Sequence, residues 1–154
     1  MGVRSDEVRA FLVRYAATLT KQDAEAAAEL WSTPGLIADD RFSGVLGSRE
    51  EMAEGLRQSY PLYRQLGLAA VEYELRDEKE LSDHLVLVGV RWLFLDDEGQ
   101  LLTDSSSYYL LRDESDGLRA CVCVETDAAE KLQALAADRG IELPTPPQTG
   151  EEPS

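Results

Sequence analysis

The spacing of apolar residues changes at Gly67, and this change constrains the fold more than any other feature of the chain. Before Gly67, apolar side chains recur at intervals of three and four residues, which is typical of amphipathic helices. After Gly67 they alternate with polar residues, which is typical of strands. The sequence therefore predicts an α+β fold, in which a group of helices packs against a sheet formed by the second half of the chain.

The first helix is expected to run from Ser5 to about Lys21. Ser5 is a good N-cap, and the acidic residues that follow it suit the positive end of the helix dipole. One apolar stripe runs along this helix, formed by Val8, Phe11, Leu12, Tyr15 and Leu19.

A second, alanine-rich helix is predicted to begin at Asp23 and to carry Leu30 and Trp31 before Pro34 and Gly35 end it. Two short apolar runs then predict a hairpin, with strands at 36–40 and 42–46.

The third helix is predicted from the capping box that starts at Ser48, and it stops at Gly67. Pro61 is expected to kink this helix or to end its regular part early. One face of the helix carries Met52, Leu56, Tyr60 and Tyr63.

Four further strands are predicted after the third helix, and the short acidic turns between them favour an antiparallel meander. Their expected ranges are 68–76, 84–95, 101–112 and 118–125. The run from Leu85 to Leu95 is apolar on both faces, so a second subunit is expected to cover its outer side. This pattern predicts a homodimer.

The 154 residues, 44% of them hydrophobic, fit one globular domain. We expect this domain to span 1–125, a C-terminal helix to span 126–141 and a disordered tail to span 142–154.

Charge and composition exclude several classes of partner. The net charge of -15 opposes binding to a phosphate backbone, so nucleic acid is not expected as a partner. No apolar run reaches the length of about 18 residues that a membrane span needs, and the N-terminus does not have the pattern of a secretory signal. A cytoplasmic protein without a membrane partner is expected, with its acidity serving solubility or adaptation to salt.

Metal chemistry is not expected either. The chain has two cysteines, Cys121 and Cys123, and one histidine, His84, which are too few soft ligands for an ordinary zinc or iron–sulfur site. No cofactor is predicted.

The candidate catalytic residues are Tyr15 and Asp39. Tyr15 lies on the apolar stripe of the first helix, and Asp39 ends the apolar run that starts at Leu36. A phenol and a carboxylate that both point into an apolar interior can act as an acid/base pair. Each also fits a structural role, Tyr15 as a core aromatic residue and Asp39 as a turn residue together with Asp40. The catalytic role requires Asp39 to point inward with Ile37.

Aromatic and serine residues on elements that should converge predict a pocket for a small hydrophobic or cyclic organic ligand. Alternation along the strand at 101–112 sends Ser105, Ser107 and Tyr109 to one face. Each aromatic residue fits the core as well as a pocket wall. The candidate ligand-binding residues are Trp31, Tyr60, Tyr63, Trp92, Ser107 and Tyr109.

The order of elements resembles the nuclear transport factor 2-like superfamily, which is also called the SnoaL-like or ketosteroid-isomerase-like fold. The resemblance spans roughly residues 5–125 and includes the segment Arg14–Leu19, the helix start at Asp23, and Trp31 followed about eight residues later by Asp39. It implies a cone-shaped, strongly bent, mostly antiparallel sheet that wraps around the N-terminal helices, with a pocket at the wide end.

The resemblance also implies roles for particular residues. Asp39 falls at the position of the family's general base, Tyr15 at that of a phenol that donates to an oxyanion, and Ser107 near that of a second donor. An isomerase, cyclase or dehydratase without a cofactor is then expected. The alternatives are a non-catalytic module that binds a ligand or a protein partner, and a dimeric accessory protein whose cone is filled by its own aromatic side chains.

Overall fold

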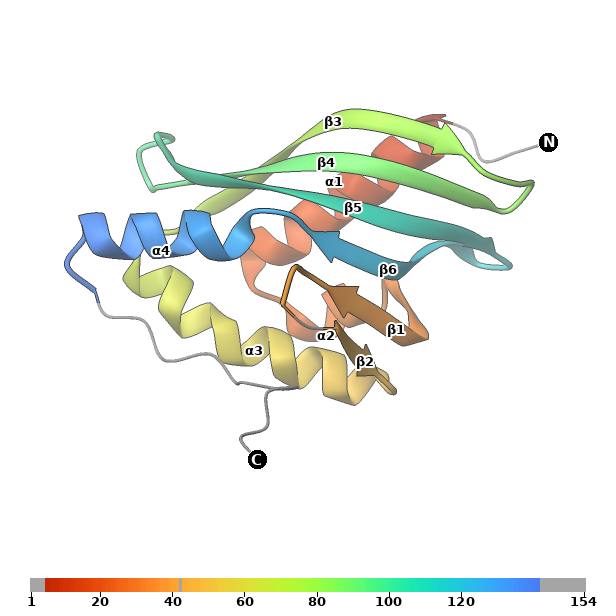
Figure 1. Cartoon of the computed structure of the whole chain (residues 1–154), viewed down its shortest axis with the longest axis horizontal. Helices are drawn as coiled ribbons and strands as arrows, with labels where there is room; N and C mark the ends of the chain where they lie inside the picture. Colours follow the sequence, from red (N-terminus) through yellow and green to blue (C-terminus); the bar gives the residue numbers. More distant parts are fainter. Residues whose placement is uncertain (1–4, 42, 142–154) are drawn as a thin grey trace.

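The computed structural model describes residues 5–41 and 43–141, and these form an α+β fold (Figure 1). Within them, six strands make one bent, unclosed sheet in the order β2-β1-β6-β5-β4-β3. The elements in chain order are α1 (Ser5–Lys21), α2 (Ala24–Ala28), β1 (Trp31–Ala38), β2 (Ser43–Leu46), α3 (Arg49–Gln65), β3 (Ala70–Glu80), β4 (Leu85–Leu95), β5 (Leu101–Glu114), β6 (Gly117–Glu125) and α4 (Ala128–Asp138).

The predicted meander is confirmed, because β3, β4, β5 and β6 pair in succession and antiparallel. The predicted hairpin is confirmed as well, with Ile37 of β1 opposite Gly44 of β2. One pair of strands is parallel: β1 lies beside β6, with Ile37 next to Cys123. The sheet is therefore mixed but mostly antiparallel, as expected.

The core lies between α1 and the inner face of the sheet. The predicted stripe of α1 is buried, since Val8, Phe11, Leu12 and Tyr15 are each exposed by 5% or less. They belong to one apolar cluster with Val88, Val90 and Trp92, which alternate along β4 and so share one face of that strand. In Figure 1, α1 lies behind the sheet, α3 lies below it, and α4 continues from β6 at one end.

The prediction for the second helix was wrong after its first turns. Asp23 does cap α2, and its side chain accepts a hydrogen bond from the backbone N–H of Ala26. The helix ends at Ala28, however, and Trp31 begins β1 instead of continuing the helix. Pairing with β6 decides the outcome, because Trp31 stands beside Ala120 in the register. Partners almost ninety positions away in sequence outweigh the local helix preference of the alanines.

Two other boundaries differ from the expected ones. The third strand continues through the acidic residues 77–80, which were predicted as a turn, because Glu78 and Glu80 pair with the apolar strand β4 while their side chains stay exposed. The helix α3 also continues beyond Pro61 to Gln65. Proline removes a single backbone donor from such a helix, and the surrounding turns still hold it.

The C-terminal helix packs against α3 rather than standing apart. Leu66 at the end of α3 forms a small buried cluster with Leu135 and Ala136 of α4. A C-terminal helix is present as α4, which at Ala128–Asp138 is shorter than the predicted range 126–141. The predicted disordered tail at 142–154 lies outside the described residues.

Two leucines of β5 give a direct test of where the core lies. Leu111 is fully buried and Leu101 is 53% exposed. We expect Leu111→Ala to lower the free energy of unfolding by about 2–5 kcal/mol, because it leaves a cavity in the core. Leu101→Ala, the matched control on the same strand, should change it by roughly 0.5 kcal/mol. Urea denaturation measures both values, and equal losses would contradict the assigned inner face of β5.

Candidate functional site

The register of the sheet brings polar residues together on its inner face. Val90 of β4 stands opposite Ser107 of β5, and Ser107 stands opposite Glu125, the last residue of β6. Across the parallel pair, Ala38 lies beside Val124, so the next positions along the two strands are Asp39 and Glu125. These two side chains share a face with the inward pair Ile37 and Cys123.

A cavity of about 210 Å³ lies between α1, α3 and the inner face of the sheet. It contains most of the predicted ligand-binding residues, namely Tyr60, Tyr63, Trp92, Ser107 and Tyr109, together with Tyr15. The full lining is Tyr15, Leu19, Gln22, Leu56, Ser59, Tyr60, Tyr63, Leu68, Val71, Trp92, Phe94, Ser105, Ser107, Tyr109, Glu125 and Ala128.

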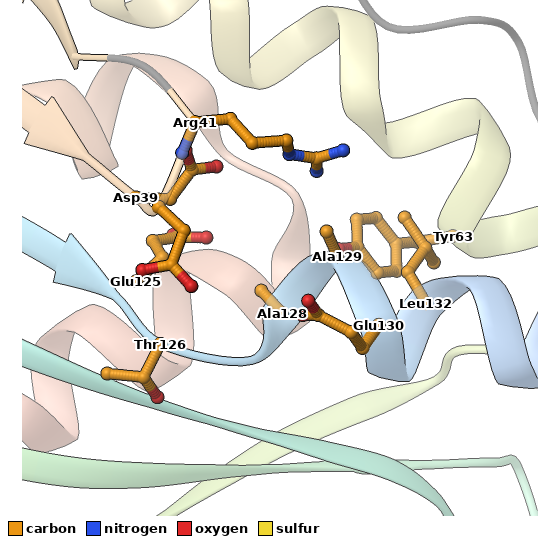
Figure 2. Close-up of a pocket in the computed structure, with 10 residues that line it drawn as sticks. Asp39, Arg41, Tyr63, Glu125, Thr126, Ala128, Ala129, Glu130 and Leu132 are labelled. Atoms are coloured by element: carbon orange, nitrogen blue, oxygen red, sulfur yellow. The ribbon is translucent and has the colours of Figure 1, made fainter.

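Asp39 does not line this cavity. It lines a neighbouring depression of about 190 Å³, which shares Tyr63, Glu125 and Ala128 with the cavity. We call this depression the mouth; its other residues are Asp40, Arg41, Thr126, Ala129, Glu130 and Leu132. Figure 2 shows the side chains of Asp39 and Glu125 next to one another in the mouth. Tyr15 and Asp39 therefore line different spaces, and Glu125 borders both of them.

The geometry of Asp39 has features that each of the two predicted roles requires, and its catalytic role stays a prediction. One of its carboxylate oxygens accepts a hydrogen bond from the backbone N–H of Arg41 at 2.8 Å, which is turn chemistry. Its side chain is nevertheless on the inward side of the strand, together with Ile37, as the catalytic role requires.

Two hydrogen bonds, each from an indole to a phenol, fix the positions of Tyr15 and Tyr109 in the cavity. The Nε1–H of Trp31 donates to the hydroxyl oxygen of Tyr15 at 3.0 Å, and that of Trp92 donates to the hydroxyl oxygen of Tyr109 at 3.2 Å. Trp31 does not line the cavity, but it positions a residue that does. A phenol oxygen that accepts from an indole keeps its own O–H for donation to another group.

Burial keeps these phenols protonated. Desolvation raises the pKa of Tyr15 and of Tyr109 far above the usual value for tyrosine. It also raises the pKa of Tyr63 to about 12. The negative charge of Glu125 adds to the shift at all three hydroxyls. These tyrosines are therefore hydrogen-bond donors, not bases, at any ordinary pH.

Glu125 is the residue that the sequence reasoning missed. Burial raises the pKa of its carboxyl group, and repulsion from Asp39 raises it further. The thiol of Cys123 approaches it at 3.9 Å, and within the described residues no cation pairs with it. The available signal was the strand alternation, which places Glu125 on the same face as Cys123.

Tyr60 contributes a buried polar atom without a partner. The side chain is 6% exposed, and its hydroxyl finds no hydrogen-bond partner within the described residues. Burial raises its pKa. A buried hydroxyl without a partner costs free energy, unless a ligand in the cavity supplies the missing hydrogen bond.

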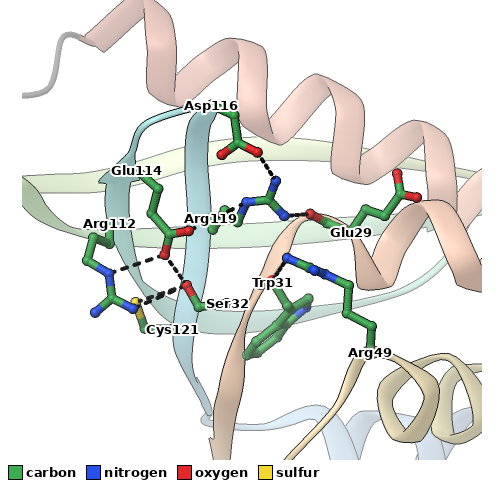
Figure 3. A network of polar contacts seen from close by, with 9 residues as sticks. All are labelled: Glu29, Trp31, Ser32, Arg49, Arg112, Glu114, Asp116, Arg119 and Cys121. Atoms are coloured by element: carbon green, nitrogen blue, oxygen red, sulfur yellow. Dashed lines mark hydrogen bonds and ion pairs between the residues drawn. The ribbon is translucent and has the colours of Figure 1, made fainter.

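Three arginines hold the start of β1 and with it Trp31 (Figure 3). Arg49 donates to the backbone carbonyl of Trp31 at 3.1 Å, and Arg112 donates to the hydroxyl of Ser32 at 3.3 Å. Arg119 donates to the backbone carbonyl of Glu29. These contacts fix the strand from which Trp31 reaches the hydroxyl of Tyr15.

The described residues contain no group of three or more His, Cys, Asp or Glu side chains arranged to hold a metal ion. Among the same residues, no helix is both long and apolar enough to cross a membrane.

Comparisons with solved structures place the fold among known ones. An NTF-2 like protein of unknown function from Shewanella oneidensis MR-1 is 14% identical, with a TM-score of 0.65 over 80% of this chain and 98% of its own. A ketosteroid isomerase-like protein from Erwinia carotovora atroseptica SCRI1043 is 15% identical, with a TM-score of 0.58 over 77% and 92%. A structure from Catenulispora acidiphila in complex with S-DNPA is 17% identical, with a TM-score of 0.61 over 81% and 94%.

A search of curated proteins found no match. The family model described as NTF2-like protein (DUF6841) matches residues 6–128, which extend from α1 to the first residue of α4. The chain therefore belongs to this NTF2-like family.

Proposed function

We propose that the protein binds a small cyclic organic ligand in the cavity and transfers a proton on it without a cofactor. One observation carries this proposal: a carboxyl group with a raised pKa, Glu125, lines the same cavity as the phenols of Tyr15 and Tyr109. A base and two neutral donors around one apolar space are the components that proton abstraction next to a carbonyl group needs.

The proposed step is an isomerisation. Glu125, as the carboxylate, removes a proton from the carbon next to the ligand's carbonyl, and the electron pair of that C–H bond forms the enolate. Tyr15 and Tyr109 donate hydrogen bonds to the enolate oxygen. The proton then returns from Glu125 to a different carbon, so no other reactant is needed. Asp39 raises the basicity of Glu125 through like-charge repulsion, and a direct catalytic role for Asp39 stays a prediction.

The comparisons support a pocket function in general terms. One solved structure of the same fold is described as ketosteroid isomerase-like, and another holds a small molecule. At these identities the likeness concerns the fold, so the reaction must be argued from the residues of this chain.

A non-catalytic ligand-binding or protein-interaction module is the second candidate. The observation in its favour is that Tyr15 and Tyr109 pack edge-to-face on Trp92, at ring-centroid distances of 5.7 Å and 6.1 Å respectively. Such packing is also what an aromatic core without a reaction would show.

We further propose that the protein acts in the cytoplasm as a homodimer. Cys121 and Cys123 are free thiols, which suits a reducing compartment. On the outer face of the sheet Tyr108 stands opposite Val124, and each is 39% exposed. The neighbouring outward row is also apolar, formed by Leu87, Leu110 and Val122. A second copy covering this face would remove that apolar surface from water.

The dimer can be tested by sedimentation. We expect a species near twice 17.0 kDa at micromolar concentration. Val124→Asp should shift the protein to the monomer, because it places a charge in the proposed interface, whereas Leu101→Asp, at an exposed position away from it, should leave the dimer intact. A wild-type protein that sediments as a monomer would contradict the proposal.

Proton transfer can be tested with nitrobenzisoxazole, whose ring opens when a base removes its C–H proton. We expect faster opening than with free acetate at the same pH. Glu125→Gln should slow it by about 100-fold or more, since the base is lost. Tyr15→Phe should slow it by at least about 10-fold, since a donor to the developing phenolate is lost.

The control for this measurement is Glu98→Gln, which removes an exposed carboxylate in the turn between β4 and β5, outside the cavity and the mouth, and should leave the rate unchanged. Equal rates in wild type and Glu125→Gln would contradict the enzyme and favour the binding module.

The pKa of Glu125 provides a test that needs no substrate. Carbon-detected NMR of its carboxyl group should give a titration midpoint above the ordinary value of 4.5, because burial and Asp39 both disfavour the charged form. Asp39→Asn should lower the midpoint by removing the repulsion. Asp40→Asn, a change at an exposed neighbour, should have little effect. A midpoint at or below 4.5 in the wild type would rule out the assigned environment of Glu125.

A further inference from the structure

The mouth of the cavity carries an excess of negative charge. Four carboxylates line it, Asp39, Asp40, Glu125 and Glu130, against a single guanidinium group, that of Arg41. In Figure 2 the side chain of Arg41 extends away from Asp39 and Glu125. The nearest lysine on α4, Lys131, is bound to Asp104 at 2.5 Å instead. Within the described residues, the carboxylate of Glu125 is therefore not neutralised by a protein cation.

Aromatic rings form the wall next to these carboxylates. Tyr63 borders both the mouth and the cavity, and its ring stacks on Phe94 with a centroid distance of 5.9 Å and an interplanar angle of 18°. Trp92 lines the cavity further in. The faces of aromatic rings attract cations, most strongly where water is excluded.

Tyr60 gives an independent indication that the cavity is built for a ligand. Tyr60 lines the cavity, and its buried hydroxyl has no hydrogen-bond partner within the described residues. A ligand with a polar group beside its apolar body would supply that partner.

We propose that the natural ligand is a small organic cation, a cyclic body that carries a protonated amine or a quaternary ammonium group. This inference rests on the proposed function, because it names the class of ligand that the same cavity takes. The cationic group lies against Glu125, Asp39 and the ring of Tyr63, and the apolar body lies against Phe94 and Trp92. The ligand thus supplies a positive charge next to Glu125, which pairs with no cation within the described residues.

The other occupants fit less well. An anion would meet carboxylates of the same sign, and a neutral ligand would leave the charge of Glu125 uncompensated in a partly buried place. A metal ion would need a cluster of ligating side chains, and the described part of the chain has no such cluster.

Three probes of matched size separate these possibilities: benzylamine, benzyl alcohol and benzoate, each titrated into the full-length protein at neutral pH. The readout is the NMR signal of the Trp92 indole N–H, which reports occupancy of the cavity. We expect the benzylammonium ion to bind roughly tenfold more tightly than benzyl alcohol, and benzoate to bind most weakly.

Two variants test which carboxylate causes the preference for benzylamine over benzyl alcohol. Glu125→Gln should reduce the preference for the amine to less than about threefold, since the removed charge is the main one facing the cavity. Glu98→Gln, an exposed acid in the turn between β4 and β5 and outside the mouth, should retain it. Bound benzylamine should also lower the titration midpoint of Glu125 in the wild type, because a nearby cation favours the carboxylate.

The outcomes separate the two proposals. If benzyl alcohol or benzoate binds as tightly as benzylamine, or if Glu125→Gln keeps the full preference, the cationic ligand is overturned while a ligand-binding cavity stands. If none of the three probes shifts the Trp92 signal, the cationic ligand is overturned and the cavity itself loses its support. The rate of nitrobenzisoxazole opening then decides separately whether proton transfer occurs.

Discussion

The parallel pairing of β1 with β6 is the contact on which the site depends. It joins segments that lie almost ninety residues apart, and it places Asp39 beside Glu125 at one end of the two strands. At the other end, Trp31 stands beside Ala120 and reaches the hydroxyl of Tyr15. Arginines from three other elements hold the start of β1 in place. A shift of this pair by one residue would turn Asp39 outward and move the indole away from the phenol.

Two polar groups in the interior, the carboxyl group of Glu125 and the hydroxyl of Tyr60, lower the stability of the folded protein. Glu125 has a raised pKa, so its contribution to stability is complete at low pH and is lost as the pH rises through that raised value. The buried hydroxyl of Tyr60 lacks a partner within the described residues. Both features reduce the stability of the empty protein near neutral pH. Such costs are typical of functional sites, where residues are arranged for a ligand rather than for the fold.

Local patterns in the sequence predict most of the fold and part of the site. The stripe of α1 and the alternation of β5 place Tyr15, Ser107 and Tyr109 in the interior, where the structure has them. Local patterns do not predict the strand that begins at Trp31. Pairing with the distant strand β6 determines this strand, whereas the preceding residues favour a helix. The role of Glu125 is not predicted either, because an acidic residue at the end of a strand is typical of a turn. Alternation places Glu125 on the same face as Cys123, and the pairing of β6 with β1 and β5 then shows that this face borders a cavity.

The helix α4 forms one side of the mouth but is attached to the sheet outside it. This helix begins just after Glu125, and Ala128, Ala129 and Leu132 line the mouth. Its attachments to the sheet include the backbone N–H of Ser106, which donates to Asp127, and the ion pair of Lys131 with Asp104. Neither contact involves the aromatic walls or Glu125. The residues that attach α4 to β5 thus line neither the cavity nor the mouth, and the width of the mouth depends on contacts that lie outside the site.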